Sequence, residues 1–100
     1  MILHDLAHAR TGDKGDTCNI SVIAYDRADF GRLRQQVTVD RVRALFGSQV
    51  RGEIIRYELP QLGALNFVLR GALGGGVTRS LALDAHGKSL GSAMLTLTIE

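Results

Sequence analysis

Short apolar and polar segments alternate along the first quarter of the chain. Ile2–Ala9 mixes apolar with polar positions, and Ile20–Tyr25 is rich in β-branched and aromatic residues. Both patterns are typical of strands. Between them, Arg10–Asn19 combines two glycines with charged and hydroxyl side chains. Charges in a core would have to be desolvated and paired, so we expect Arg10–Asn19 to be a surface loop joining two strands.

The middle of the chain predicts one clear helix. Thr38 has the residue type of an N-cap, apolar residues then recur at helical spacing, and Gly47 ends the pattern. The apolar positions are Val39, Val42, Leu45 and Phe46. The preceding segment, Asp26–Gln36, is polar and predicts a weak helix or an ordered loop.

The next two segments predict a strand and then a second helix. Val50–Leu59 alternates imperfectly and stops at Pro60, which would interrupt a ladder of hydrogen bonds. Its positions on one face are Ile55, Tyr57 and Leu59. Gln61–Arg70 predicts a helix because its leucines recur at helical spacing, and these are Leu62, Leu65 and Leu69.

The last third predicts a closing hairpin. Gly71 ends the second predicted helix, and Val77–Asp84 and Ser89–Ile99 have the apolar alternation of strands. Ala85–Lys88 supplies the turn between them. Leu81 and Leu83 share a face of the first of these strands, and Ala93, Leu95, Leu97 and Ile99 share a face of the second.

The predicted element order is β-β-α-β-α-β-β. We therefore expect an α+β fold, a two-layer sandwich with a mostly antiparallel sheet and two helices on one face. One hundred residues correspond to a single domain, residues 1–100, with one modest core.

Composition and charge exclude several classes of protein. The chain is 45% hydrophobic and 22% charged with a net charge of +2, as in ordinary globular proteins. It lacks the apolar run of about 20 residues that a membrane helix needs and the pattern of a signal peptide. A single cysteine fits the reducing cytoplasm. Five aromatic residues among scattered arginines give little platform for stacking bases, so we expect neither nucleic-acid nor membrane partners.

The predicted loop carries the main candidate chemistry. Gly12 and Gly15 would let backbone N–H groups turn toward one point, with Lys14 between the two glycines, and this arrangement is an anion cradle. The alternative is a tight turn whose charges are only solvated. The spacing does not match a Walker A loop or a G-x-G-x-x-G motif.

Metal and nucleophile sites are weakly indicated. On a strand, His4 and His8 share a face but lie about 13 Å apart, at about 3.3 Å per residue, too far to hold one ion. Cys18 is either a nucleophile or, as is usual for a lone cysteine, a small hydrophobic residue. One thiolate cannot hold an iron–sulfur cluster. We expect no metal and no cofactor.

Three further features have two interpretations each. Asn66, within an apolar segment, either ties its helix to a neighbouring loop or binds the Gly12–Gly15 loop or a ligand. The run of Gly74, Gly75 and Gly76 indicates a close approach of the backbone to another part of the chain or to a partner. Arg79 either pairs internally with Asp13 or Asp16, or binds a carboxylate or phosphate through its planar fork.

Three segments carry a resemblance to a known family. They are "AHARTGDKGDTCNISVIA", "RYELPQLGALNFVL" and "LGGGVTRSLALDAHGKSLG", and they closely resemble the C-terminal ferredoxin-like domain of AtuA-type acyclic terpene utilisation proteins. The family's loop usually reads R-S-G-D-K-G, and Thr11 keeps the hydroxyl of that serine. The resemblance implies a free-standing version of this domain, with a ferredoxin-like fold.

The resemblance also implies a function. We expect an accessory or interaction subunit that pairs with a separately encoded large AtuA-type protein, in terpenoid or acyl-CoA catabolism. One alternative is an enzyme component whose Gly-Asp-Lys-Gly loop helps to bind an acyl-CoA or another anionic substrate. Another is a self-associating structural domain. No nucleophile–base pair that would act alone is visible. The candidate ligand- or partner-binding residues are Arg10, Gly12, Asp13, Lys14, Gly15, Asp16, Asn19, Asn66, Gly74, Gly75, Gly76 and Arg79.

Overall fold

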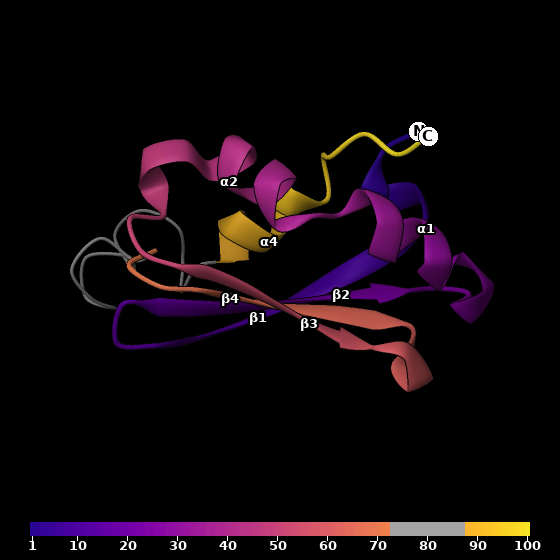
Figure 1. Cartoon of the computed structure of the whole chain (residues 1–100), viewed down its shortest axis with the longest axis horizontal. Helices are drawn as coiled ribbons and strands as arrows, with labels where there is room; N and C mark the ends of the chain where they lie inside the picture. Colours follow the sequence, from indigo (N-terminus) through magenta and orange to yellow (C-terminus); the bar gives the residue numbers. More distant parts are fainter. Residues whose placement is uncertain (73–87) are drawn as a thin grey trace.

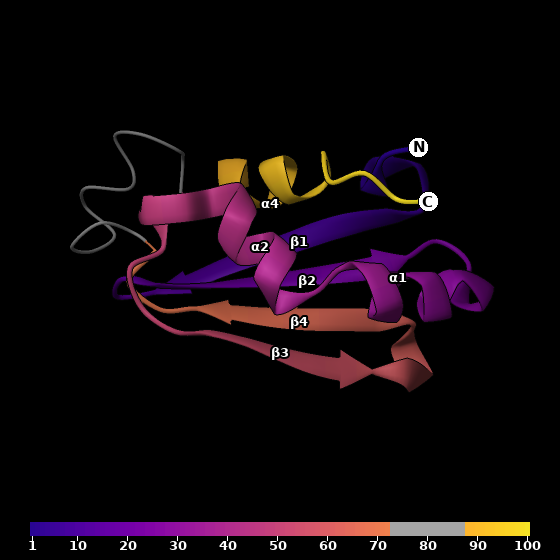
Figure 2. The same ribbon diagram turned by 45° about the horizontal axis from the view of Figure 1, so that its top comes forward.

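A four-stranded antiparallel sheet is the central element of the protein. The computed structural model describes residues 1–72 and 88–100. The strands follow the spatial order β1-β2-β4-β3 (Figure 2). Their bounds are β1 (Ala7–Lys14), β2 (Thr17–Ala24), β3 (Ile54–Leu59) and β4 (Ala64–Leu69).

Helices cover one face of this sheet, as Figure 1 shows. In the described part of the chain these are α1 (Phe30–Gln36), α2 (Val39–Phe46) and α4 (Lys88–Met94). Short 3-10 turns occupy Leu3–Asp5, Arg27–Asp29, Gly47–Gln49 and Pro60–Leu62. The predicted class, a two-layer α+β fold with an antiparallel sheet and helices on one face, is confirmed. The predicted order of elements is wrong in its second half.

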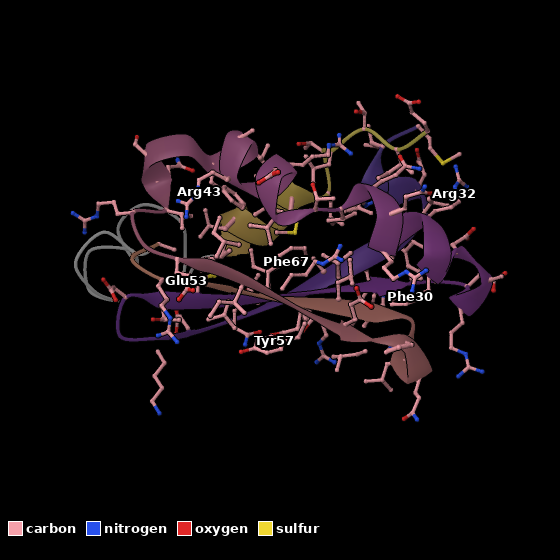
Figure 3. All side chains as sticks on the ribbon, in the orientation of Figure 1. Phe30, Arg32, Arg43, Glu53, Tyr57 and Phe67 are labelled. Carbon is pink, nitrogen blue, oxygen red and sulfur yellow. The ribbon has the colours of Figure 1, made fainter. Side chains whose placement is uncertain are left out.

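The core fills the space between the helices and the two central strands. Alternate residues of β2 and β4 point into it, and Phe67 is completely buried there, on the opposite side of the sheet from Tyr57 (Figure 3). The buried strand residues are Cys18, Ile20, Val22, Ala24, Leu65, Phe67 and Leu69. Leu33, Val42, Phe46 and Met94 close the core from the helices.

The middle helices form as their local signals predict. The Thr38 hydroxyl oxygen accepts a hydrogen bond from the Arg41 backbone N–H at 3.2 Å, and Gly47 is the C-cap of α2. In the weaker segment Asp26–Gln36, the helix α1 forms and buries Leu33 completely. Burial of this one aliphatic side chain compensates for the polar composition of the segment.

The prediction of a helix over Gln61–Arg70 is wrong. Pro60 begins a 3-10 turn, Gly63 reverses the chain with φ +63°, and β4 then pairs with both β2 and β3. The leucine spacing fits a helix, but Leu65 and Leu69 also fit a period of two once Phe67 is included. Pairing on both sides makes β4 a central strand. Strand β3, predicted from Val50, begins only at Ile54.

The predicted strand over Ile2–Ala9 begins only at Ala7, and the prediction of a loop over Arg10–Asn19 is wrong except for the turn at Gly15 and Asp16. Leu3–Asp5 forms a 3-10 turn, and β1 continues through the supposed loop as far as Lys14. It pairs with β2 along its whole length, from Ala7 opposite Ala24 to Lys14 opposite Thr17. A strand can carry these charges because Arg10 and Lys14 point to the face of the sheet that no described helix covers, where both are exposed.

The C-terminal strand predicted over Ser89–Ile99 is a helix in its first half. In α4, Leu90 and Met94 are buried four residues apart, a helical spacing that competes with the alternation read from the sequence. Gly91 lies so close to β1 that an added Cβ would be 2.7 Å from the Thr11 side chain. The predicted strand Val77–Asp84 and residues 85–87 of the predicted turn lie outside the described residues.

The two ends of the chain lie together on the helix side (Figure 1). The Ile99 backbone N–H donates to the Met1 carbonyl oxygen at 2.8 Å, and the Leu3 N–H donates to the Leu97 oxygen at 2.7 Å. Leu97 and Ile99 are buried there. Within the described residues, no helix is long and apolar enough to cross a membrane.

We predict opposite effects for alanine at two glycines. Gly63→Ala should lower the free energy of unfolding by about 1–2 kcal/mol, because φ is +63° and the new Cβ would be 2.9 Å from Arg27 Cγ. Gly31→Ala, in α1 with nothing within 4 Å of the new Cβ, should raise it by up to about 1 kcal/mol. Urea denaturation measures both, and a loss of stability in Gly31→Ala would contradict the assignment of α1.

Candidate functional site

One face of the sheet has no helix over it in the described part of the chain, and we call this the open face. Because side chains alternate along a strand, the register fixes its members once the buried residues are known. They are His8, Arg10, Gly12, Lys14, Thr17, Asn19, Ser21, Ile23, Ile55, Tyr57, Leu59, Ala64, Asn66 and Val68. Five of the candidate residues, Arg10, Gly12, Lys14, Asn19 and Asn66, are among them.

Asn66 joins the two central strands at the middle of this face. Its Nδ2 atom donates to Asn19 Oδ1 at 2.7 Å and to Ser21 Oγ at 2.8 Å, so both of its amide hydrogens are used. Asn66 ties its element to a neighbour, but it joins two strands, whereas the first interpretation placed it between a helix and a loop. The second interpretation, binding of a ligand, stays a prediction. This polar cluster lies between strands β2 and β4, with β1 on one side and β3 on the other.

Strand β1 presents two cations on the open face. Arg10 and Lys14 are exposed and stand four residues apart, about 13 Å along the strand. Neither side chain has a hydrogen bond or an ion pair with any described residue. Between them, Gly12 leaves the surface bare, since an added Cβ would meet nothing within 4 Å.

The remaining candidates are divided between other places. Asp13 lies on the helix side, opposite Cys18 in the register, and its Oδ2 atom is buried without a partner among the described residues. Gly15, with φ +63°, and Asp16 form the turn between β1 and β2. The Asp16 carbonyl oxygen accepts from the Ala72 backbone N–H at 2.9 Å. The other candidates, Gly74, Gly75, Gly76 and Arg79, lie outside the described residues.

The prediction of an anion cradle made of backbone N–H groups is wrong for Arg10–Lys14. A loop that gathers backbone N–H groups does not form between Arg10 and Lys14, because this segment is paired with β2. The donors on this half of the open face are the two cations with the amides and hydroxyls beside them. A role for these residues in binding stays a prediction.

Apolar side chains on the other half of the open face were not among the candidates. Tyr57 is 51% exposed and Leu59 is 38% exposed on the edge strand β3, and Ile55 and Val68 lie beside them, partly buried. The sequence pattern does place Ile55, Tyr57 and Leu59 on one face. It does not say which face the helices cover, because that depends on the packing of distant segments.

His4, His8 and Cys18 belong to three different elements. His4 is in the first 3-10 turn, whereas His8 stacks on Tyr25 with ring centroids 5.5 Å apart. Cys18 is completely buried in the core. The described residues contain no group of three metal-ligating side chains.

A shallow hollow of about 350 Å³ lies between the edge of β1 and α4. Its lining residues are Ala9, Arg10, Thr11, Gly91, Ser92 and Leu95. None of these residues is a histidine, a cysteine or a carboxylate, so the hollow offers groups for binding rather than for proton transfer.

Comparisons with known proteins agree with the motifs. A family model described as the AtuA ferredoxin-like domain matches residues 1–100, the whole chain. No match is found among curated proteins or among solved structures.

We predict that removing the Asn66 amide costs more than removing its acceptor. Asn66→Ala eliminates two hydrogen bonds and should lower the free energy of unfolding by about 1–2 kcal/mol, at about 0.5–1.5 kcal/mol for each. Asn19→Ala eliminates one of them and should cost about half as much. Urea denaturation of both variants measures the difference, and equal losses would show that Asn66 is not the centre of the cluster.

Proposed function

The chain belongs to the AtuA ferredoxin-like domain family, and we propose that it works as an accessory or interaction subunit. Its partner would be a separately encoded large AtuA-type protein, in terpenoid or acyl-CoA catabolism. Long proteins that this chain resembles carry such a large domain in the same polypeptide. A split into two chains preserves the need for the two domains to touch.

The open face of the sheet is the observation that supports this proposal best. An antiparallel sheet with one solvated face normally carries polar residues there. Here half of the face is apolar, and its exposed members are Tyr57 and Leu59. Tyrosine is enriched in protein interfaces, where its ring supplies contact area and its hydroxyl a hydrogen bond. An accessory subunit needs such a surface.

The size of the open face suits a small complex. Four strands about 4.8 Å apart, with about six residues each at 3.3 Å, cover roughly 20 Å by 20 Å. Burial of that surface on both partners removes on the order of 800 Å² from solvent, which corresponds to the weak or transient class of complexes. We therefore propose that the subunit binds its partner reversibly and dissociates readily.

A second candidate function is favoured by one specific observation. Arg10 and Lys14, which have no ion-pair partner among the described residues, lie on either side of the bare surface at Gly12, and phosphate groups are natural ligands of such cations. An enzyme component that holds an acyl-CoA or another anionic substrate would use them. Titration with an acyl-CoA in the absence of any partner separates this function from docking. The third alternative is a self-associating structural domain. It predicts that the isolated chain forms oligomers, which the other two functions do not require.

We predict that Tyr57→Ser weakens binding to the large AtuA-type protein about tenfold or more, because an exposed aromatic ring of the proposed interface is lost. Titration calorimetry and co-elution in size-exclusion chromatography measure the effect. Ile2→Ser is the matched control, since Ile2 is an exposed apolar residue, 41% accessible, at the chain end on the helix side (Figure 1). It should bind like the wild type.

Two observations on the native system complete this test. A large AtuA-type reading frame beside the gene, and co-purification of its product identified by mass spectrometry, are the expected results. A monomer that ignores the large protein in both assays would overturn the proposed function.

A further inference from the structure

The open face is positively charged along its edge strand β1 and apolar along its other edge strand, β3. One row across the sheet runs from Arg10 on β1 through Ser21 and Asn66 to Tyr57 on β3. Neighbouring strands lie about 4.8 Å apart, so a cation and an aromatic ring stand at the two ends of a row about 14 Å long. Lys14 repeats the positive charge further along β1.

Arg10 and Lys14 have no counter-charge among the described strand residues of the open face. Among the described strand residues, no aspartate or glutamate lies on the open face. Asp13 points to the helix side. Glu53 lies just before β3, in the row of the register that contains Lys14, and its Oε1 atom is already 3.8 Å from Arg70 Nε. Covering the face with another protein would desolvate Arg10 and Lys14, which is costly unless that protein supplies acceptors.

A second copy of the chain would not supply those acceptors from its own open face. If two open faces met about a two-fold axis across the strands, β1 would lie over β1 and cations would face cations. If the axis ran along the strands, β1 would lie over β3 of the other copy. Arg10 would then face Tyr57, and Lys14 would face the position of Glu53, whose carboxylate is already 3.8 Å from Arg70. Neither arrangement gives both cations an acceptor that is still unpaired.

We infer that the partner is a different protein whose contact surface is acidic over β1 and apolar over β3 and β4. This inference rests on the proposed function and adds the chemistry and orientation of the bound surface. The apolar half holds the complex together, whereas the charged half steers the encounter and fixes which edge of the partner lies over β1. The two halves therefore have separable kinetic effects.

The experiment measures association and dissociation rates of the large AtuA-type protein by surface plasmon resonance at about 0.05 M and 0.5 M NaCl. Arg10→Gln and Lys14→Gln each remove one unpaired charge from β1. Arg34→Gln is the matched control, because Arg34 is an exposed arginine in the helix layer whose side chain has no partner among the described residues. Unchanged circular dichroism and thermal midpoints show that the variants are folded.

We expect Arg10→Gln and Lys14→Gln to slow association several-fold at low salt and to differ little from the wild type at high salt, where charges are screened beyond about 4 Å. Tyr57→Ser should speed dissociation at both concentrations. Arg34→Gln should match the wild type. Lys14→Glu should slow association more than Lys14→Gln.

Two contrary results have different meanings. If the wild type binds but neither β1 variant alters the association rate, docking stands and the acidic partner surface is wrong. If the wild type does not bind the large protein at either salt concentration, the proposed function fails and this inference fails with it. A wild-type chain that instead forms dimers through Tyr57 would replace the acidic partner with a second copy.

Discussion

The two-residue period of side chains along paired strands is the constraint on which the rest of this structure depends. It sends Ile20 and Phe67 into the core and, in the same strands, Ser21 and Asn66 to the opposite side. A shift of one residue in the register between β2 and β4 would exchange these two sets. Core and open face are therefore two results of one pairing pattern, and a mutation that affects the register affects both.

Local signals in the sequence predict the elements that depend on few distant contacts. The helix α2 has its N-cap, apolar spacing and terminal glycine within ten residues, and it forms as expected. Strand β4 and helix α4 are mispredicted because their apolar residues fit two periods at once. The choice is made by tertiary contacts: β4 pairs on both sides, and α4 packs Gly91 against Thr11.

The sequence predicts several residues of the candidate site, but not how the fold arranges them in space. The sequence predicts that Arg10, Gly12 and Lys14 belong to one loop. They do lie on the same surface, but the reason is that alternation along β1 keeps every second residue on one face. Asn66 lies 47 residues after Asn19, and the two meet only because β2 and β4 pair. No local pattern contains that contact. The apolar half of the same face is visible in the sequence only as alternation, since exposure is decided by which face the helices cover.

The contact between the two ends of the chain has a consequence for engineering. Met1 and Ile99 are joined by backbone hydrogen bonds, so a short linker could connect the termini without moving either of them. The chain could then be opened at the Gly15–Asp16 turn, which lies at the opposite end of β1 from the N-terminal segment. Such a circular permutant would retain every strand pair of the sheet while separating β1 from β2 in the order of synthesis. The same geometry lets a label or an immobilisation anchor at either terminus point away from the open face.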